Sequence, residues 1–554
     1  MLKNNKIKYS ISRHRILLMG ILCLFGVYLI AGNHSVNKKK TPKSKKDLVY
    51  ILNSDETIGD EVRRPDITLL QGNVRLRHKG MYMFCDSAYL NEKTNSFEAF
   101  GKVHMEQGDT LFIYGNYLKY DGFKELAKLR ENVKLVNRKT TLLTDSLDYD
   151  RVLDKAYYFE GGTMLDQENV LTSDWGEYSP STKNAVFNFD VKLVNPRFTL
   201  KTDTLKYNSG NGIAHIVGPS RIDSEKNHIT SKRGYYNTRA DQAQLLDRSL
   251  LVNEDGRKLT GDSIYYDRKK GYGEAFYNVL MTDSVNKNFL KGDYCFYNEL
   301  TGNAVATKKA LAVDYSQGDT LYLHGDTLKL NTFNIKTDSM YREMRAFRKV
   351  RFFRKDIQGT CDSLFFSSKD TCLRMYKDPI LWSENKQLLG EEIRIYMNDS
   401  TIDWAHIVNQ ALSIEEKDSV HYNQVTGKDI KAYFVGGDMR KVDVIGNVRL
   451  VYYPEEKDST MMGMNVSETS LLNIYLKDKK MDKMVMSPAS SGTLYPMLMI
   501  PPDKLKLENF GWFDFIRPLN KDDIFEWRGK KAGQVLKNKG RKAIPLPNHE
   551  LLKK

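Results

Sequence analysis

The stretch Thr144-Asp145-Ser146-Leu147-Asp148-Tyr149-Asp150 is one copy of a phrase that returns about every 29 residues along most of the chain. Each copy places an Asp before Ser or Thr and then a hydrophobic residue. Further copies stand at Cys85–Ala88, Thr202–Asn208, Gly261–Asp267, Gly325–Leu328 and Cys361–Leu364. A series of alanines keeps nearly the same spacing: Ala99, Ala127, Ala156, Ala185, Ala214 and Ala243. Two independent markers at one period predict an architecture of stacked repeats.

One unit, residues 127–154, shows what each repeat forms. Apolar residues alternate with polar ones, so that Leu147 and Tyr149 share a face, and this period of two predicts roughly two β-strands per unit. The dipeptides Gly72-Asn73 and Glu131-Asn132, each followed by Val, suit a β-bulge inside the first strand. We expect the recurrent Asp, as in Asp145, to hold a bend by bonding backbone N–H groups.

The chain divides into four parts by composition. Residues 1–31 hold a basic start and an apolar run, which is typical of a signal peptide or a membrane anchor. Residues 32–47 form a basic linker, and residues 48–455 form the repeated body, one open-ended stack of strands. Residues 456–554 form a C-terminal tail whose aromatic cluster, from Phe510 to Trp527, either caps the terminal strand edge or docks a partner.

The formal charge of +15 does not belong to the body. Residues 1–46 contribute +11 and residues 521–554 contribute +6, which leaves −2 for the residues between them. A protein that tracks phosphates needs a basic stripe on its folded surface. The distribution therefore argues against a nucleic-acid partner. It leaves the N-terminal segment as a candidate for membrane contact.

The chain shows no recognisable catalytic or metal-binding motif. The prominent aspartates occupy one repeated structural position, and no His or Cys spacing is typical of a metal site. We therefore predict a protein that is not an enzyme and has no cofactor or metal. Cys361 and Cys372 are close enough in sequence to suggest a small disulfide. Two alternatives stay open: a parallel β-helix enzyme acting on acidic polysaccharide, and a structural or adhesive β-solenoid.

The repeats Gly72-Asn73-Val74-Arg75-Leu76 and Thr202 to Tyr207 resemble those of the OstA/LptA family, and the length resembles the OstA-like type of the Bacteroidetes group. The resemblance covers roughly residues 48–455. It implies an all-β, elongated and twisted β-jelly roll, open at both ends, whose interior holds the acyl chains of lipopolysaccharide. By motif position, the residues expected on this lipid-binding inner face are Val74, Leu76, Val133, Leu135, Leu147, Tyr149, Leu205, Tyr207, Val448 and Leu450.

The resemblance also implies where the protein acts and with what. It implies a periplasmic protein, exported by its N-terminal signal or tethered to the inner membrane, that carries lipopolysaccharide or a related glycolipid toward the outer membrane, with which it could associate. Its expected partners are the lipopolysaccharide acyl chains and other lipopolysaccharide-transport jelly rolls, joined by pairing of edge strands.

Overall fold

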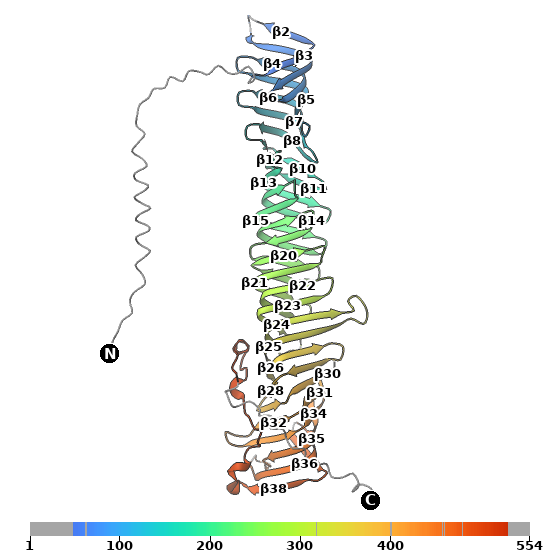
Figure 1. Cartoon of the computed structure of the whole chain (residues 1–554), viewed down its shortest axis with the longest axis vertical. Helices are drawn as coiled ribbons and strands as arrows, with labels where there is room; N and C mark the ends of the chain where they lie inside the picture. The colour runs from blue at the N-terminus through green and yellow to red at the C-terminus, as the bar shows by residue number, and fades with distance from the viewer. Residues whose placement is uncertain are drawn as a thin grey trace, which may run out of the picture.

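The computed structural model describes residues 48–529, except 61, 63, 317, 399, 400, 457, 459 and 479. These residues form one elongated stack of β-strands with β2 near one end and β38 at the other (Figure 1). No helix in this described part of the chain is long and apolar enough to cross a membrane. The predicted signal peptide or anchor and the basic linker, residues 1–47, lie outside the described residues.

The strands follow one another as a series of hairpins. The first group is β1 (Tyr50–Asn53), β2 (Glu56–Asp60), β3 (Arg64–His78), β4 (Met81–Asn91), β5 (Ser96–Gln107), β6 (Leu111–Asp121), β7 (Leu126–Asn137), β8 (Thr140–Asp150), β9 (Lys155–Tyr158), β10 (Gly162–Asp166), β11 (Asn169–Ser173), β12 (Trp175–Ser179) and β13 (Asn184–Asn195). The second is β14 (Phe198–Asn208), β15 (Ile213–Ser224), β16 (Asn227–Asn237), β17 (Gln242–Leu245), β18 (Ser249–Asn253), β19 (Lys258–Gly261), β20 (Ser263–Asp267), β21 (Tyr272–Asp283), β22 (Asn288–Asn298), β23 (Asn303–Asp314), β24 (Leu321–Phe333), β25 (Tyr341–Phe353) and β26 (Gln358–Ser367). The third is β27 (Cys372–Tyr376), β28 (Ile380–Ser383), β29 (Lys386–Leu389), β30 (Glu392–Asn398), β31 (Thr401–Val408), β32 (Ala411–Glu416), β33 (Tyr422–Gly427), β34 (Asp429–Val435), β35 (Asp438–Tyr452), β36 (Gly463–Lys477), β37 (Lys480–Ser487) and β38 (Ser491–Pro496).

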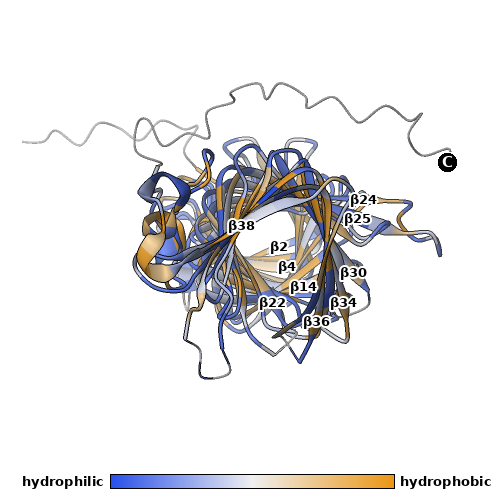
Figure 2. Ribbon diagram, turned by 90° about the horizontal axis from the view of Figure 1, so that it is seen from below, coloured by the Kyte–Doolittle hydropathy of each residue, from blue (hydrophilic) through white to orange (hydrophobic). Residues whose placement is uncertain are grey.

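All pairings between these described strands are antiparallel and join them into one sheet. The antiparallel pairing excludes the parallel β-helix that sequence alone left open, and the all-β jelly roll is the fold of the chain. The stack also continues past residue 455, through β36, β37 and β38. Viewed along the long axis, the bent strands form two walls that face each other (Figure 2).

Bulges in the long strands produce the corner between the two walls. In β7, Glu131 and Asn132 both have positive φ, 65° and 53°, and the register with β8 shifts between Arg130 and Val133. The bulge predicted at this dipeptide is therefore confirmed. Asp145 lies beside it on β8, and its Oδ1 accepts the backbone N–H of Asn132 at 3.2 Å. The repeated Asp thus holds the bulge of the preceding strand rather than a bend in its own.

The predicted disulfide between Cys361 and Cys372 is wrong. Cys85, Cys295, Cys361 and Cys372 are all free thiols and all buried. Cys361 pairs with Val350 on β25, whereas Cys372 pairs with Ser367 at the far end of β26, so the two thiols occupy different walls of the same hairpin. Burial raises the pKa of the Cys361 and Cys372 thiols, which keeps them protonated.

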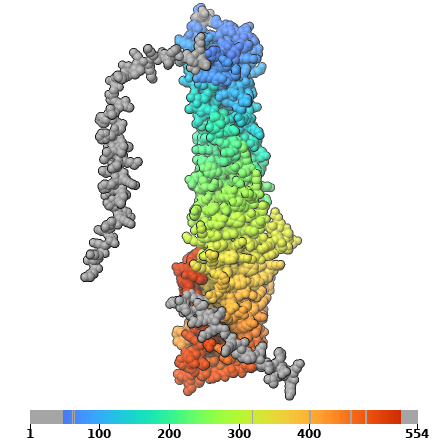
Figure 3. Space-filling view, viewed as in Figure 1, coloured from blue at the N-terminus to red at the C-terminus, as the bar shows by residue number. Residues whose placement is uncertain are grey.

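The C-terminal segment runs back along the outside of the stack. Residues 497–527, which we call the C-terminal strap, include the 3-10 turns η2 (Met497–Met499), η3 (Pro502–Lys504), η4 (Asp514–Ile516) and η5 (Asp523–Phe525). In Figures 1 and 3 the strap follows one side of the body from β38 toward β25. Phe513 and Ile516 pack on outward side chains of the wall, including Ile380, Trp382 and Leu412. The aromatic cluster therefore covers a side wall of the stack rather than its terminal edge.

Candidate functional site

The interior of the jelly roll is the candidate site, and the strand register shows which residues line it. On the first wall, cross-strand neighbours form one continuous inward row from Leu76 to Leu450. In order it consists of Leu76, Met83, Met105, Ile113, Leu135, Leu142, Met164, Leu171, Leu193, Leu200, Ile222, Ile229, Leu251, Leu259, Met281, Leu290, Ala312, Leu323, Phe352, Gly359, Leu381, Leu388, Ser413, Val425 and Leu450.

The second wall carries a matching row. Its members are Phe97, Tyr120, Ala127, Tyr149, Ala156, Tyr178, Ala185, Tyr207, Ala214, Tyr236, Ala243, Tyr266, Gly273, Tyr297, Ala304, Leu330, Met344, Phe366, Leu373, Ile395, Ala405, Ala432, Val442, Ile474 and Met484. The alanine marker of the sequence is thereby explained, because each alanine from Ala127 on separates two large side chains on neighbouring strands. Ala99 is different: it pairs with Ala88 and Leu118, off this row.

All ten residues predicted for the inner face are buried and point inward. Leu76, Leu135 and Leu450 belong to the first-wall row, and Tyr149 and Tyr207 belong to the second-wall row. The remaining five flank the corner: Val74, Val133, Leu147, Leu205 and Val448. None of the ten is more than 5% exposed. These side chains are therefore packed against one another, and whether any of them contacts lipid stays a prediction.

Exposure divides the interior into two sections. From Leu76 and Phe97 to Ile229 and Ala243, which we call the closed section, no row member exceeds 8% exposure. From Leu251 and Tyr266 to Leu450 and Met484, the open section, many row members are only half-buried. They are Leu251, Leu259, Tyr266, Met281, Leu290, Ala312, Leu330, Met344, Phe366, Leu373, Leu388, Val425, Val442, Ile474 and Met484. Among the described residues of the two rows, solvent therefore reaches the inner face chiefly along the C-terminal part of the stack.

Four tyrosines of the second wall bond to polar residues of the first wall in the closed section: Tyr120, Tyr149, Tyr178 and Tyr207. We call this line of contacts the seam. The Tyr120 hydroxyl lies 2.6 Å from Nδ1 of His78, and the Tyr178 hydroxyl accepts from Nδ2 of Asn137 at 2.9 Å. Each partner is 41 or 42 residues earlier in the chain and sits at a hairpin turn. The seam joins the free edges of the two walls opposite the corner, so the closed section is sealed on both sides.

Tyr207 shows the electrostatics of the seam. Its hydroxyl donates to Oδ2 of Asp166 at 2.5 Å and accepts from Nδ2 of Asn169 at 3.0 Å. Burial raises the pKa of Tyr207 and the pKa of Asp166, although the hydrogen bond from Tyr207 and the charge of Arg239 oppose the shift at Asp166. Burial likewise raises the pKa of Tyr120 to about 12. The tyrosines therefore stay protonated and can donate at neutral pH.

Arginines at the hairpin turns reinforce the seam. Nη2 of Arg151 donates to the Lys79 carbonyl at 3.2 Å, and Nη2 of Arg197 donates to the Thr238 carbonyl at 2.8 Å. Nη1 of Arg268 donates to the Arg197 carbonyl at 3.2 Å. Among the described residues this is the last hydrogen bond to cross the seam. The polar partners could not be predicted from the sequence, because nothing local distinguishes them from ordinary turn residues.

The tyrosine contacts change near the end of the closed section, where Tyr236 donates to Oδ1 of Asp241 on its own wall. Tyr266 donates to Glu299, which lies on its own wall, at 3.4 Å, and the Tyr297 side chain is 39% exposed. At the next equivalent positions the hydroxyl is lost, since Leu330 and Phe366 follow Tyr297 in the row. The free edges of the two walls are therefore not joined by tyrosines in this section.

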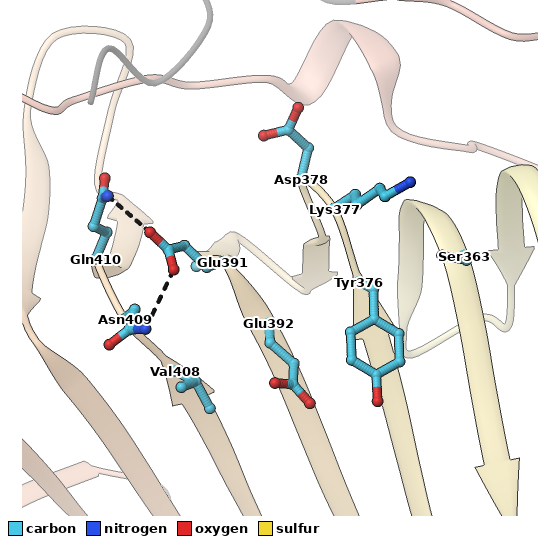
Figure 4. Close-up of a pocket in the computed structure, with 10 residues that line it drawn as sticks. Ser363, Tyr376, Lys377, Asp378, Glu391, Glu392, Val408, Asn409 and Gln410 are labelled. Atoms are coloured by element: carbon cyan, nitrogen blue, oxygen red, sulfur yellow. Dashed lines mark hydrogen bonds between the residues drawn. The ribbon is translucent and has the colours of Figure 1, made fainter.

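A surface groove of about 640 Å³ lies at the corner of the open section, where strands break (Figure 4). Glu391 accepts hydrogen bonds there from Nδ2 of Asn409 at 3.2 Å and from Nε2 of Gln410 at 3.0 Å. Asn409 and Gln410 have positive φ, 53° and 48°, as the bulge residues of other repeats do. The groove is thus a widened copy of the corner bulge. Among the described residues, no group of His, Cys, Asp and Glu could hold a metal ion.

The fold and its interior define a class of protein: a long antiparallel β-jelly roll of stacked repeats with an apolar interior. Residues 46–203 and 197–257 match the model of a family described as OstA-like protein. This part of the chain is therefore similar to OstA-like proteins, in agreement with the resemblance that its repeats show.

Comparison with solved structures gives a weak likeness. The chain is similar to LptH from Pseudomonas aeruginosa, the LptA homologous periplasmic component of a conserved lipopolysaccharide transport device. The identity is 11% and the TM-score 0.19, and the match covers 22% of this chain and 84% of that chain. No curated protein sequence matches the chain.

Proposed function

We propose that this protein binds lipopolysaccharide or a related glycolipid by its acyl chains, and that it transports the lipid across the periplasm to the outer membrane as a non-catalytic bridge. The observation that supports this function is the inner face of the open section, which is continuous, apolar and partly exposed to solvent. The resemblance of the repeats to the OstA/LptA family makes lipopolysaccharide the first lipid to test.

The energetics favour an acyl chain as the occupant. Burying a methylene group gains about 0.8 kcal/mol, so ten methylenes held against the walls gain about 8 kcal/mol. From Leu251 to Leu450 the first-wall row spans about 60 Å at the strand spacing of about 4.8 Å. That length accommodates several acyl chains one after another. A polar head group would remain outside, at the free edges of the walls.

The ends of the stack support assembly with other jelly rolls. Among the described strands, β1 and β2 pair only with β3, and β37 and β38 pair only with β36. Their outer edges therefore offer unpaired backbone groups, which a further strand could extend. We propose that neighbouring lipopolysaccharide-transport proteins join the stack at these edges.

Two adjacent residues of β21 give a matched test. Met281 points into the interior, whereas Leu280 points outward beside Thr260 and Lys291, and both are half-buried. The full chain is purified from envelope extract, and the bound lipopolysaccharide is quantified by mass spectrometry of its fatty acids. We expect Met281→Glu to reduce bound lipid about five-fold or more, because a charge in an apolar lining is unfavourable.

The control and the wild type decide between the functions. Leu280→Glu is expected to retain the wild-type amount of lipid. Equal losses in both variants, with both folded, would contradict binding inside the jelly roll. A wild-type protein without bound lipid would favour the structural or adhesive solenoid instead.

A further inference from the structure

We propose that lipid occupies only the open section of the interior, and that the tyrosine seam keeps the closed section shut to it. This inference rests on the proposed function and states which part of the interior binds lipid. The N-terminal part of the stack is then a sealed spacer. Lipid enters and leaves between the free edges of the walls beyond Arg268.

Packing supports the exclusion of lipid from the closed section. Leu142, Met164 and Leu171 are neighbours on the first-wall row, and each has an exposed fraction of 0%. Across from them, Tyr149 is also 0% exposed and Tyr178 is 1% exposed. A side chain without exposure has no adjacent space even for a water molecule. An acyl chain could enter here only if the walls separated.

The seam opposes that separation. Moving the walls apart would break the bonds of Tyr178 to Asn137 and of Tyr207 to Asp166, and would leave buried polar groups without partners. Nδ2 of Asn137 also donates to the Pro180 carbonyl at 2.7 Å, so the same side chain ties a turn of the opposite wall. The hydrogen bonds of the seam therefore hold the two walls at a fixed distance from each other.

The open section differs from the closed section in having a lining that can face an acyl chain. From Leu251 to Leu450 and from Tyr266 to Met484, neither row contains a charged side chain. At the positions that carry seam tyrosines earlier in the chain, the open section first holds Tyr266 and Tyr297, which make no hydrogen bond across the seam to any described residue, and then Leu330 and Phe366. Apolar side chains without hydroxyls, such as Leu330 and Phe366, can face an acyl chain without leaving a hydrogen bond unmade.

The methionines of the chain provide a built-in test. Met83, Met105 and Met164 lie on the first-wall row of the closed section, and none is more than 2% exposed. The corresponding methionines of the open section are half-buried and stand on its two rows: Met281, Met344 and Met484. The full chain is produced with methionine replaced by its diazirine analogue, which is nearly the same size, and is incubated with purified lipopolysaccharide. After illumination, mass spectrometry maps the cross-linked peptides.

We expect cross-links at Met281, Met344 and Met484 to exceed those at Met83, Met105 and Met164 by at least about ten-fold. Met499, which is 72% exposed on the outside, measures non-specific contact. Equal yields in the two sections would overturn the proposed limit while leaving lipid binding intact. If no inward methionine cross-links above Met499, the proposed function itself fails.

A triple variant tests the role of the tyrosines. Tyr149→Phe, Tyr178→Phe and Tyr207→Phe together keep the rings and remove the hydroxyls that reach Gln107, Asn137 and Asp166. Circular dichroism checks that the variant is folded. In the analogue-labelled protein we expect cross-linking at Met164 to rise at least about five-fold. Unchanged labelling of Met164 in a folded variant would show that the seam does not close the section.

Discussion

Gln387 holds the C-terminal strap, and replacing it by methionine should release the strap without unfolding the stack. The side chain has an exposed fraction of 0%. Its Nε2 donates to the Gly511 carbonyl at 2.7 Å, and its Oε1 accepts from the Phe513 N–H at 2.8 Å and from Nε1 of Trp382 at 3.1 Å. Gln387→Met keeps the volume of the side chain but removes all three hydrogen bonds.

The magnitude follows from the three groups that lose their partner. A buried polar group left without a hydrogen bond is unfavourable by about 1–3 kcal/mol, so the strap should be destabilised by roughly 3–6 kcal/mol after partial relaxation. The backbone ladders of β28 and β29 are untouched, since Gln387 points outward from the wall. The loss should therefore appear as local opening of the strap.

Trypsin measures that opening, because Lys504, Lys506 and Lys521 provide cleavage sites along the strap. When cleavage tracks the population of the open form, roughly 3–6 kcal/mol corresponds to cleavage faster by about 10²- to 10⁴-fold. Gln244→Met, at an exposed position on β17, is the control and should be cleaved as the wild type is. Wild-type cleavage kinetics in Gln387→Met would refute the assignment of Gln387 as the clamp.

Two further predictions concern the corner and the response to acid. Gly101 has φ +75°, and an added Cβ would lie 2.5 Å from Oδ2 of Asp86. Gly101→Ala should therefore destabilise the protein by roughly 1–3 kcal/mol in urea unfolding. The control Gly59→Ala places its Cβ where no atom of the described residues lies within 4 Å and should leave the stability unchanged, so equal effects of the two substitutions would contradict the predicted strain at Gly101. Burial alone would raise the pKa of Asp247, but hydrogen bonds from Ser231 and nearby backbone N–H groups outweigh it and lower the pKa. Because the folded pKa is lowered, Asp247 stabilises the fold above its unfolded pKa of about 4, and that contribution is lost as the pH falls through the folded value. The difference in urea midpoint between wild type and Asp247→Asn should therefore be constant near pH 7 and shrink toward pH 3, and a difference independent of pH would refute this.

The local parts of the structure could be predicted from the sequence because their causes are local. Alternation places Leu147 and Tyr149 on one face whatever lies beyond the strand, and a dipeptide such as Glu131-Asn132 signals a bulge through its tolerance of positive φ. The jelly roll itself did not follow from alternation. It came from the resemblance of the repeats to a known family, since alternation does not say which strands pair.

Contacts between distant segments could not be predicted in this way. Gln387 and Gln424 alternate with the inward residues Leu388 and Val425, so they read as solvent-facing positions. In the structure each side chain bonds both a carbonyl and an N–H of the strap; for Gln424 these are the Leu505 carbonyl at 2.7 Å and the Leu507 N–H at 2.9 Å. A glutamine side chain matches an extended backbone in this manner only when the tertiary fold brings the two together. No spacing in the sequence encodes that approach.

The division of the interior into a closed and an open section could be predicted only in part from the sequence. The relevant signal is the identity of the residue at the tyrosine position of the repeated phrase. Alternation identifies inward positions but cannot distinguish a packed core from a lining, since both require apolar side chains. The hydroxyl of the tyrosine makes the distinction. A buried hydroxyl needs a partner within about 3 Å, so it is suited to walls that touch and unsuited to walls that part. The phrase carries a tyrosine at Tyr149 and Tyr207 in the closed section. Tyr266 keeps the tyrosine at the start of the open section without a bond across the seam to any described residue, and Leu330 and Phe366 replace it farther on.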